Sequence, residues 1–440
     1  MSEQLHTKDV IFTVNPGGRL SGSLRVPGDK SISHRAIMLG SIAEGVSEIK
    51  GFLEAEDSLA TLNAFRDMGV NIDGPKQGQV IIQGVGMHGL RAPEKPLYLG
   101  NSGTSMRLLA GLLSGQAFDV EMTGDPSLTR RPMKRVADPL MIMGASIQTG
   151  PQGTPPLKIK GGQALQGIHY EMPMASAQVK SCLLLAGLYA KGRTCVTEPA
   201  AARDHTERML SGFGYVIERT GSTVCLTGGG RLVATDIDVP ADISSAAFFM
   251  VAGAIAPESE ILLEHVGINP TRIGVVNILR LMGADIELLN EKVVGGEPVA
   301  DIRVRASELK GINIPQDQVP LAIDEFPSIF VAAACANGTT VLTGAEELRV
   351  KESDRIQAMA DGLTRIGVAA QPTPDGMIIQ GGNITGGTVE SHGDHRIAMA
   401  LSIAALRAKE PIVVNDCANV NTSFPGFVEM AQRVGLGIDW

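Results

Sequence analysis

Residues 279–288 read Leu-Arg-Leu-Met-Gly-Ala-Asp-Ile-Glu-Leu, which is the end of a helix-like run, one glycine and then alternating apolar residues. Five other stretches repeat this phrase, and successive central glycines are 75, 70, 69, 84 and 68 residues apart. A glycine in this place is typical of the residue that ends a helix, and the alternation predicts a strand. The six glycines are Gly69, Gly144, Gly214, Gly283, Gly367 and Gly435. The 440-residue chain is therefore predicted to contain six similar α/β units.

Each unit contains a second helix, half a unit away, that is rich in small and apolar residues. Residues 243–256, Ile-Ser-Ser-Ala-Ala-Phe-Phe-Met-Val-Ala-Gly-Ala-Ile-Ala, show the pattern. A helix that is apolar on every face belongs in the middle of a domain, so three such helices inside a ring of sheets would make one domain. Six units would then make two domains, with one crossing near Val239 and Pro240. A single continuous solenoid is the alternative, but the most polar helix starts occur in only some units, as a two-domain cleft would require.

Composition limits the partners and the compartment. The chain has 38 basic and 47 acidic residues, a net charge of −9 and only 4% aromatic residues, which argues against a nucleic-acid partner. Residues 246–256 are the longest uncharged apolar stretch and are too short to cross a membrane. The N-terminal stretch lacks the apolar core of a signal peptide. The five scattered cysteines are predicted to be buried free thiols in a reducing compartment, so we expect a cytoplasmic protein.

Polar residues concentrate at the starts of the apolar helices. Residues 27–35 read Pro-Gly-Asp-Lys-Ser-Ile-Ser-His-Arg, and residues 100–107 read Gly-Asn-Ser-Gly-Thr-Ser-Met-Arg. Helix N-termini carry partial positive charge and unpaired N–H groups, which suit anions. Capped helices with solvated charges are the alternative for each segment alone. These residues stand at the same position in several of the repeated units. We therefore predict a cleft between two domains that binds two phosphate- or carboxylate-bearing substrates.

The second half of the chain adds charged side chains of both signs. Lys351 and Arg355 are four residues apart, so both project from one face of a helix. Asp324 opens an apolar helix, and a carboxylate beside cations at a cleft is a candidate general base. His392 and His395 are three residues apart across a glycine, which does not fit a paired-histidine metal site. No metal site is predicted.

With these segments assembled, the sequence resembles the 5-enolpyruvylshikimate-3-phosphate synthase family, and in particular its divergent bacterial class II branch. The matching segments are PGDKSISHRA, LGNSGTSMR, RRP, SAQVKS, RVKESDR and GDHRIAM, in this order from about Pro16 onward. The resemblance implies a two-domain inside-out α/β barrel, the enolpyruvyl transferase fold, with six βαβαββ repeats, three in each domain. Residues 1–22 with 241–440 would form one domain, and residues 23–240 the other.

The resemblance also implies the reaction and its residues. The enolpyruvyl group of phosphoenolpyruvate would pass to the 5-hydroxyl of shikimate 3-phosphate through a tetrahedral intermediate, in a monomer without metal or organic cofactor. Asp324, Glu352 and Lys30 would be catalytic. Shikimate 3-phosphate would be bound by Lys30, Ser31, Arg35, Ser176, Ala177, Gln178, Arg203, Asp324 and Lys351. Phosphoenolpyruvate would be bound by Lys30, Gly103, Arg131, Gln178, Arg355 and Arg396, with His395 supporting the Arg396 loop.

Three positions depart from the pattern of many members of the family. Ala177 stands where they have serine, Glu347 where they have asparagine, and Thr422 where they have lysine. Two other functions remain open at this point. A UDP-N-acetylglucosamine enolpyruvyl transferase would usually carry a reactive cysteine around Thr129–Arg135, where this chain has none. A non-catalytic anion-binding repeat protein would lack at least one of the catalytic residues, all of which are present.

Overall fold

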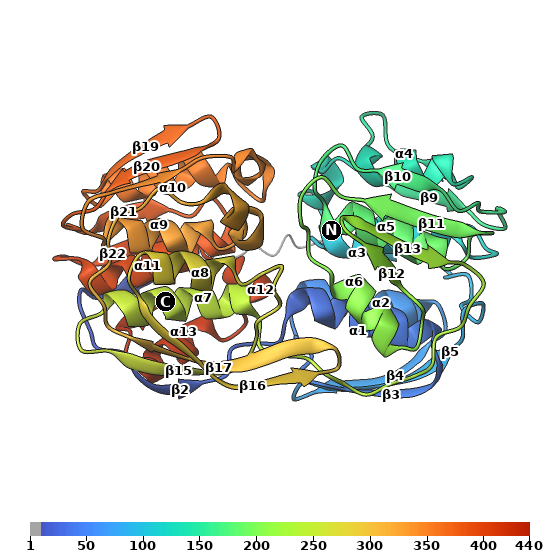
Figure 1. The fold of residues 1–440 in the computed structure, drawn as a ribbon, viewed down its shortest axis with the longest axis horizontal. Helices are drawn as coiled ribbons and strands as arrows, with labels where there is room; N and C mark the ends of the chain where they lie inside the picture. Colours follow the sequence, from blue (N-terminus) through green and yellow to red (C-terminus); the bar gives the residue numbers. More distant parts are fainter. Residues whose placement is uncertain (1–9) are drawn as a thin grey trace, which may run out of the picture. The chain divides into compact units, whose positions relative to one another are not determined.

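A computed structural model describes residues 10–440, and the chain divides into two compact units (Figure 1). Unit 1 contains the described residues up to Pro27, Pro240–Lys292 and Pro298–Trp440. Unit 2 contains Gly28–Val239 and the short segment Val293–Glu297. The chain thus leaves unit 1 after Pro27 and returns to it at Pro240. Residues 293–297, the tip of a later β-hairpin, belong to unit 2.

Unit 2 is built from three four-stranded sheets with one shared strand plan. In each sheet a short parallel pair is followed by two antiparallel neighbours. The sheets are β14(Ile237–Asp238)-β3(Glu44–Lys50)-β5(Gln79–Val85)-β4(Asn71–Lys76), β6(Leu97–Tyr98)-β7(Val120–Thr123)-β9(Leu157–Lys160)-β8(Ser146–Gln148) and β10(His169–Glu171)-β11(Arg193–Thr197)-β13(Thr223–Thr227)-β12(Glu218–Thr220). Three repeats of one α/β motif therefore make up this unit.

Unit 1 repeats the plan, with one shortened sheet. Its sheets are β21(Gly387–Glu390)-β22(Ile412–Asn415)-β1(Phe12–Val14)-β23(Ile438–Asp439), β16(Asp285–Val294)-β17(Glu297–Arg305)-β15(Glu260–Gly267)-β2(Ser21–Leu24) and β18(Thr339–Leu342)-β20(Gly376–Gln380)-β19(Ala369–Thr373). An isolated parallel bridge from Asn313 to Val341 stands where the third sheet would have its fourth strand. The predicted α/β fold with six repeats, three in each unit, is confirmed over residues 10–440.

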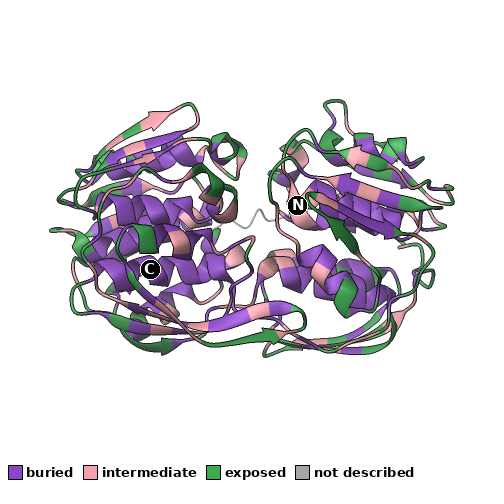
Figure 2. Ribbon diagram, viewed as in Figure 1, coloured by how far each residue is buried: buried purple, intermediate pink, exposed green. Residues whose placement is uncertain are grey.

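The helices are of the two predicted kinds. The apolar ones are α1(Lys30–Ile42), α3(Gly103–Ser114) and α5(Ala177–Gly187) in unit 2, and α7(Ile243–Ile255), α9(Phe326–Ala334) and α11(His395–Ala404) in unit 1. Every residue of α7 is buried, and Figure 2 shows these helices in the interior of their units. The amphipathic helices are α2(Glu56–Asp67), α4(Lys134–Ile142), α6(His205–Gly212), α8(Gly274–Leu281), α10(Arg355–Arg365) and α13(Phe427–Val434).

The remaining short helices are α12(Val420–Ser423), η1(Leu128–Arg130), η2(Gln316–Gln318), η3(Pro320–Ala322), η4(Glu346–Val350) and η5(Ala405–Arg407). All six glycines of the repeated phrase have positive φ, between +81° and +112°. A residue with a β-carbon is strained in that conformation, which is why glycine ends the amphipathic helix in each repeat. Within residues 10–440, no helix is long and apolar enough to cross a membrane.

The prediction of five free thiols is wrong for two of them. Cys195 and Cys225 form a disulfide between β11 and β13. The two residues are 30 apart in the chain, so their spacing gave no sign of pairing, but the antiparallel register places them directly opposite each other. Cys182, Cys335 and Cys417 are free, and burial raises the pKa of the Cys417 thiol to about 12. Cys182 and Cys417 are buried in the apolar interior, and Cys335 is partly buried.

Candidate active site

In unit 2 most of the predicted site residues lie in the first two turns of the three buried helices, while Arg131 follows η1 and Arg203 precedes α6. Asp29, Ser102 and Ser176 cap α1, α3 and α5, and each side chain accepts a hydrogen bond from a backbone N–H of the first turn. Gln178 joins two of these helices, because its amide donates to Thr104 Oγ1 at 3.1 Å and accepts from Arg107 at 2.6 Å. The structure thus brings the starts of α3 and α5 together, as the repeat predicted.

Arg35 joins α1 to the other elements of unit 2. Its Nε donates to Thr206 Oγ1 at 2.7 Å, and its two terminal nitrogens donate to the Ser31 carbonyl at 2.9 Å and Ser181 Oγ at 2.7 Å. Burial lowers the pKa of Arg35 to about 10, although Glu207 opposes this, so the side chain stays charged near neutral pH. Arg35 therefore fixes the start of α1, including the backbone of Ser31.

Gly103 lies between two guanidinium groups. A β-carbon at this position would be 3.1 Å from a terminal nitrogen of Arg107 and 3.1 Å from one of Arg131. Arg131 is itself held by Asn101, whose Oδ1 accepts from it at 2.6 Å. Glycine at the start of α3 therefore leaves room beside two cations for an anion to approach the helix N-terminus. The sequence analysis did not include Arg107 or Asn101 among the site residues, although both stand in the quoted segment 100–107.

Lys30 and His34 complete the start of α1. Lys30 Nζ is 3.2 Å from Asp57 Oδ2, an ion pair that orients the lysine at the first residue of the helix. His34 is fully buried, and its Nδ1 is 2.7 Å from Thr61 Oγ1. Burial lowers the pKa of His34 to about 3, so this histidine is neutral and is a packing residue.

In unit 1 the structure brings all the predicted residues of that unit together around Asp324. Lys351 Nζ is 3.4 Å from Asp324 Oδ1, and Arg355 donates to the same oxygen at 3.5 Å. Arg396 donates to the Asp324 main-chain carbonyl at 3.0 Å. Two cations from segment 351–355 thus face the Asp324 carboxylate, and Arg396, from a separate segment, contacts the main chain of the same residue.

Arg355 is almost completely buried and is held by carboxylates. Its Nε donates to Asp394 Oδ2 at 2.8 Å and a terminal nitrogen donates to Glu352 Oε2 at 2.6 Å. Burial alone would lower the pKa of Arg355, but Asp394 and Glu352 raise it above its usual value. Lys351 behaves alike, because Asp324 and Glu347 raise its pKa against the effect of burial. Both groups are therefore permanent cations and cannot serve as bases.

Two of the departures from the family pattern have local explanations. Glu347 Oε1 is 2.6 Å from Lys351 Nζ, so a charged partner stands where many family members have a neutral amide. Thr422 Oγ1 donates to the Asn419 carbonyl at 2.7 Å, within the short helix α12. The hydroxyl of Thr422 thus satisfies its own turn and does not replace a lysine.

Arg396 is oriented by residues that the sequence analysis did not select. Asp394 caps α11 and accepts from the Arg396 backbone N–H at 2.9 Å. The buried carboxylate of Glu325 is 4.0 Å from the Arg396 guanidinium and accepts a hydrogen bond from Ser244. His395 is largely buried beside them. Among residues 10–440, no group of three or more His, Cys, Asp and Glu side chains is arranged to hold a metal ion.

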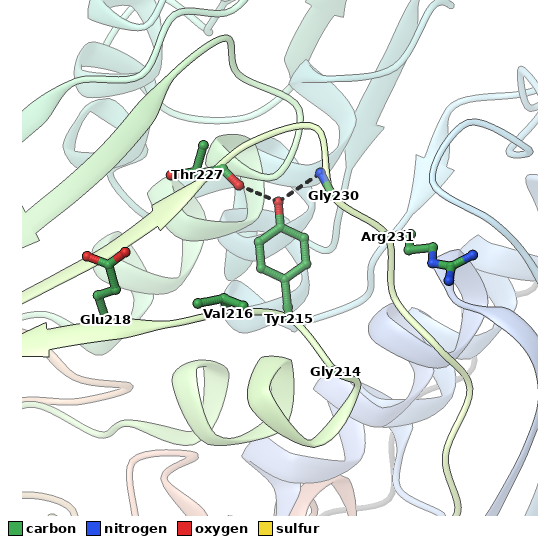
Figure 3. A pocket seen from close by; sticks show the side chains of 7 residues that line it. All are labelled: Gly214, Tyr215, Val216, Glu218, Thr227, Gly230 and Arg231. Carbon is green, nitrogen blue, oxygen red and sulfur yellow. Dashed lines mark hydrogen bonds between the residues drawn. The ribbon is translucent and has the colours of Figure 1, made fainter.

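A pocket of about 270 Å³ lies in unit 2 (Figure 3). It is lined by Gly214, Tyr215, Val216, Glu218, Thr227, Gly230 and Arg231. The Tyr215 hydroxyl donates to the Thr227 carbonyl at 2.7 Å and accepts from the Gly230 N–H at 3.2 Å, so its polar atom is satisfied within the protein. None of the predicted site residues lines this pocket.

Known proteins resemble this chain over nearly its whole length. A family model described as EPSP synthase (3-phosphoshikimate 1-carboxyvinyltransferase) matches residues 14–430. Two relatives named 3-phosphoshikimate 1-carboxyvinyltransferase are those of Methylococcus capsulatus, 68% identical, and Nitrosococcus oceani, 69% identical. The alignments cover 99% of this chain in both cases, and 100% and 98% of the relatives. A solved EPSP synthase structure from Acinetobacter baumannii is 61% identical, with a TM-score of 0.91, over 98% of this chain and 99% of that one.

Proposed function

Because this chain belongs to the EPSP synthase family, we propose that it transfers the carboxyvinyl group of phosphoenolpyruvate to the 5-hydroxyl of shikimate 3-phosphate and releases phosphate. The observation that supports this most directly is the cluster of Lys351, Arg355 and Arg396 around Asp324. A carboxylate in this setting can take a proton from a hydroxyl, while the cations attract anionic substrates.

The addition step uses two carboxyl groups. Asp324 accepts the 5-hydroxyl proton as the hydroxyl oxygen bonds to C2 of phosphoenolpyruvate. Glu352, which is a carboxylate beside Arg355 in the free protein, first takes up a proton from solvent. It donates this proton to C3, which gives a tetrahedral intermediate that still carries phosphate. Arg355 contacts both carboxylates, at 3.5 Å and 2.6 Å, and thereby holds the acid and the base in a fixed relation. Positioning of this kind is a large part of catalysis in two-substrate reactions.

The elimination step reverses the role of Glu352. Its carboxylate removes a proton from C3, the bond from C2 to the phosphate oxygen breaks, and phosphate leaves. Lys30, at the start of α1, offsets the negative charge on the leaving group. Asp324 returns the 5-hydroxyl proton to the departing phosphate, and Glu352 returns its proton to solvent, so both carboxyl groups regain their starting states. Atoms and electrons then balance with the two substrates alone, and the proposed reaction requires neither a metal ion nor an organic cofactor.

The remaining residues bind the two substrates. The helix starts of unit 2 would bind shikimate 3-phosphate through Lys30, Ser31, Arg35, Ser176, Ala177, Gln178 and Arg203, with Asp324 and Lys351 contributed by unit 1. Phosphoenolpyruvate would be bound by Lys30, Gly103, Arg131 and Gln178 of unit 2 and by Arg355 and Arg396 of unit 1. The proposal therefore requires residues of both units to contact the same substrates. We further propose that the protein acts as a monomer in the cytoplasm.

The test is phosphate release from phosphoenolpyruvate by the purified protein, with shikimate 3-phosphate in one reaction and UDP-N-acetylglucosamine in another. We expect release only with shikimate 3-phosphate, and transfer to the 5-hydroxyl in the product. Release only with the nucleotide sugar would replace the proposed acceptor. Release with neither, together with a ligand-induced rise in Tm, would indicate a binding protein without the chemistry.

A further inference from the structure

Four charged side chains form a cluster behind the start of α5 in unit 2. These residues, Lys180, Glu198, Glu207 and Arg219, are here called the Lys180 cluster. The side chains of Lys180, Glu198 and Glu207 are 1%, 2% and 7% exposed, while that of Arg219 reaches the surface. Two cations face two carboxylates, so the cluster carries no net charge. None of the four is among the predicted site residues.

Lys180 is at the centre of the cluster. Its Nζ donates to Glu198 Oε2 at 2.8 Å and to the Ala202 carbonyl at 3.2 Å. It also lies 2.8 Å from Glu207 Oε1, as an ion pair whose direction is not that of a hydrogen bond. Arg219 donates to the other oxygen of Glu198 at 2.8 Å. A buried ammonium group is stable only when it is paired in this way.

The partners of Lys180 all lie in one segment, residues 198–207. Glu198 follows β11, Ala202 lies in the connecting loop, and Glu207 lies in the first turn of α6. Lys180 thus contacts the beginning, middle and end of the segment. Arg203 immediately follows the carbonyl that Lys180 holds. The lysine itself lies two residues after Gln178 on α5.

Other contacts hold the far side of the same segment. His205 Nδ1 is 2.8 Å from Glu297 Oε1, and Arg208 donates to Asp204 Oδ1 at 2.9 Å. These contacts fix the start of α6, and Thr206 Oγ1 donates to Ser181 Oγ on α5 at 2.7 Å. The contact from Lys180 to the Ala202 carbonyl ties the backbone directly before Arg203 to α5.

We propose that Lys180 is a positioning residue for shikimate 3-phosphate, because it sets the place of Arg203 relative to Ser176 and Gln178. The inference rests on the proposed function, in which these three residues bind that substrate. Lys180 itself touches no substrate. It acts through the Ala202 carbonyl, and the glutamates of the cluster keep its charge compatible with burial.

The test is the charge-balanced double variant Lys180→Met with Glu198→Gln. The variant retains Glu207 and Arg219, which are 3.9 Å apart, so the net charge of the cluster stays at zero. It removes the contact to the Ala202 carbonyl. We expect the Kd for shikimate 3-phosphate, measured by calorimetry, to rise about tenfold. The KM for phosphoenolpyruvate at saturating shikimate 3-phosphate should stay within about twofold of wild type, because Arg131, Arg355 and Arg396 are outside the cluster.

Two results would overturn the inference. An unchanged Kd for shikimate 3-phosphate in the folded variant would make the cluster purely structural. A rise by the same factor in the Kd for shikimate 3-phosphate and in the KM for phosphoenolpyruvate would show a general loss of the native structure. If the variant does not show the circular dichroism melt of a folded protein, Lys180→Leu with Glu198→Gln takes its place, with the same two criteria. The wild-type enzyme is assayed first, because failure to release phosphate there contradicts the proposed function and not this inference.

A matched control is Glu218→Gln. Glu218 lies on β12 of the same sheet and pairs with exposed Arg193, so this change removes a carboxylate near the cluster without touching segment 198–207. We expect wild-type affinity for shikimate 3-phosphate in this control. If this control loses as much affinity for shikimate 3-phosphate as the double variant does, any charge change in the sheet lowers the affinity. That result would refute the positioning role of Lys180.

Discussion

The substitution Asp394→Asn tests how Arg355 is held. Arg355 and Asp394 are both buried and make two hydrogen bonds, at 2.8 Å and 3.3 Å. Asparagine has nearly the same shape, and its side-chain oxygen can still accept from the Arg396 N–H, so the helix cap survives. Its amide nitrogen then stands at the Oδ2 position and cannot accept from Arg355 Nε, so the change removes both the negative charge and the 2.8 Å hydrogen bond. Breaking a buried ion pair from one side costs about 3–5 kcal/mol. Glu352 and Asp324 still face Arg355, so we expect the lower end, about 3 kcal/mol.

The assay is urea unfolding followed by circular dichroism, with the steady-state KM for phosphoenolpyruvate measured beside it. A double-mutant cycle with Arg355→Met separates the pair from the rest of the site. We expect the two changes to be strongly non-additive and the KM to rise in both single variants. A loss of less than about 1 kcal/mol in the free energy of unfolding, with an unchanged KM for phosphoenolpyruvate, would refute the reasoning. An ion pair at the surface contributes no more than that to stability.

The same pair predicts a pH dependence. Burial by itself would raise the pKa of Asp394, but the Arg355 guanidinium holds it below the usual 3.8. A carboxyl whose pKa is lower in the folded than in the unfolded chain stabilises the fold above the unfolded value. The stabilisation is lost as the pH falls through the folded-state pKa. The difference in unfolding free energy between wild type and Asp394→Asn should therefore be constant above about pH 5 and shrink in stronger acid.

Three further substitutions probe the proposed chemistry. Asp324→Ala should leave the Kd for shikimate 3-phosphate nearly unchanged and lower kcat by roughly 10²–10⁴, and an unchanged kcat would remove this residue from the mechanism. Gly103→Ala places a β-carbon 3.1 Å from the Arg131 guanidinium, so the KM for phosphoenolpyruvate should rise while that for shikimate 3-phosphate does not. Glu325→Gln keeps the shape but removes the charge 4.0 Å from Arg396, so the KM for phosphoenolpyruvate should rise about tenfold at constant Tm. A fall in Tm with a normal KM would assign that carboxylate to stability.

The repeats and the polar helix starts were predictable because both are local signals. A glycine with positive φ ends a helix in each repeat, and its place can be read from the residues around it. The grouping of Lys351 and Arg355 around Asp324 also followed from sequence, since each stands near the start of a helix. What the sequence could not show is which distant residue pairs with each charge. Asp394 is 39 residues from Arg355, and only the packing of α10 beside α11 brings them together.

The disulfide and the Lys180 cluster were missed for the same reason. Cys195 and Cys225 are opposite each other because of strand register, which is not visible in their spacing. Lys180 stands in an apolar helix, where a lone lysine suggests a solvated side chain. The structure places it instead among the carboxylates of two later elements. Sequence signals locate secondary structure well, but a pairing between separate elements depends on how those elements pack.

The two units use one helix-capping position in different electrostatic ways. In unit 1 the N-cap residues of α7, α9 and α11 are all carboxylates, Asp242, Glu325 and Asp394, and each lies near an arginine. A carboxylate there offsets the positive end of the helix and orients the arginine beside it. In unit 2 a carboxylate, Asp29, caps only α1, and the caps of α3 and α5 are the neutral residues Ser102 and Ser176, which leave the charge of these two helix ends available to a bound anion. The same repeat can thus supply oriented cationic side chains in unit 1 and open anion-binding helix ends in unit 2, and a reaction that joins two phosphorylated substrates needs both.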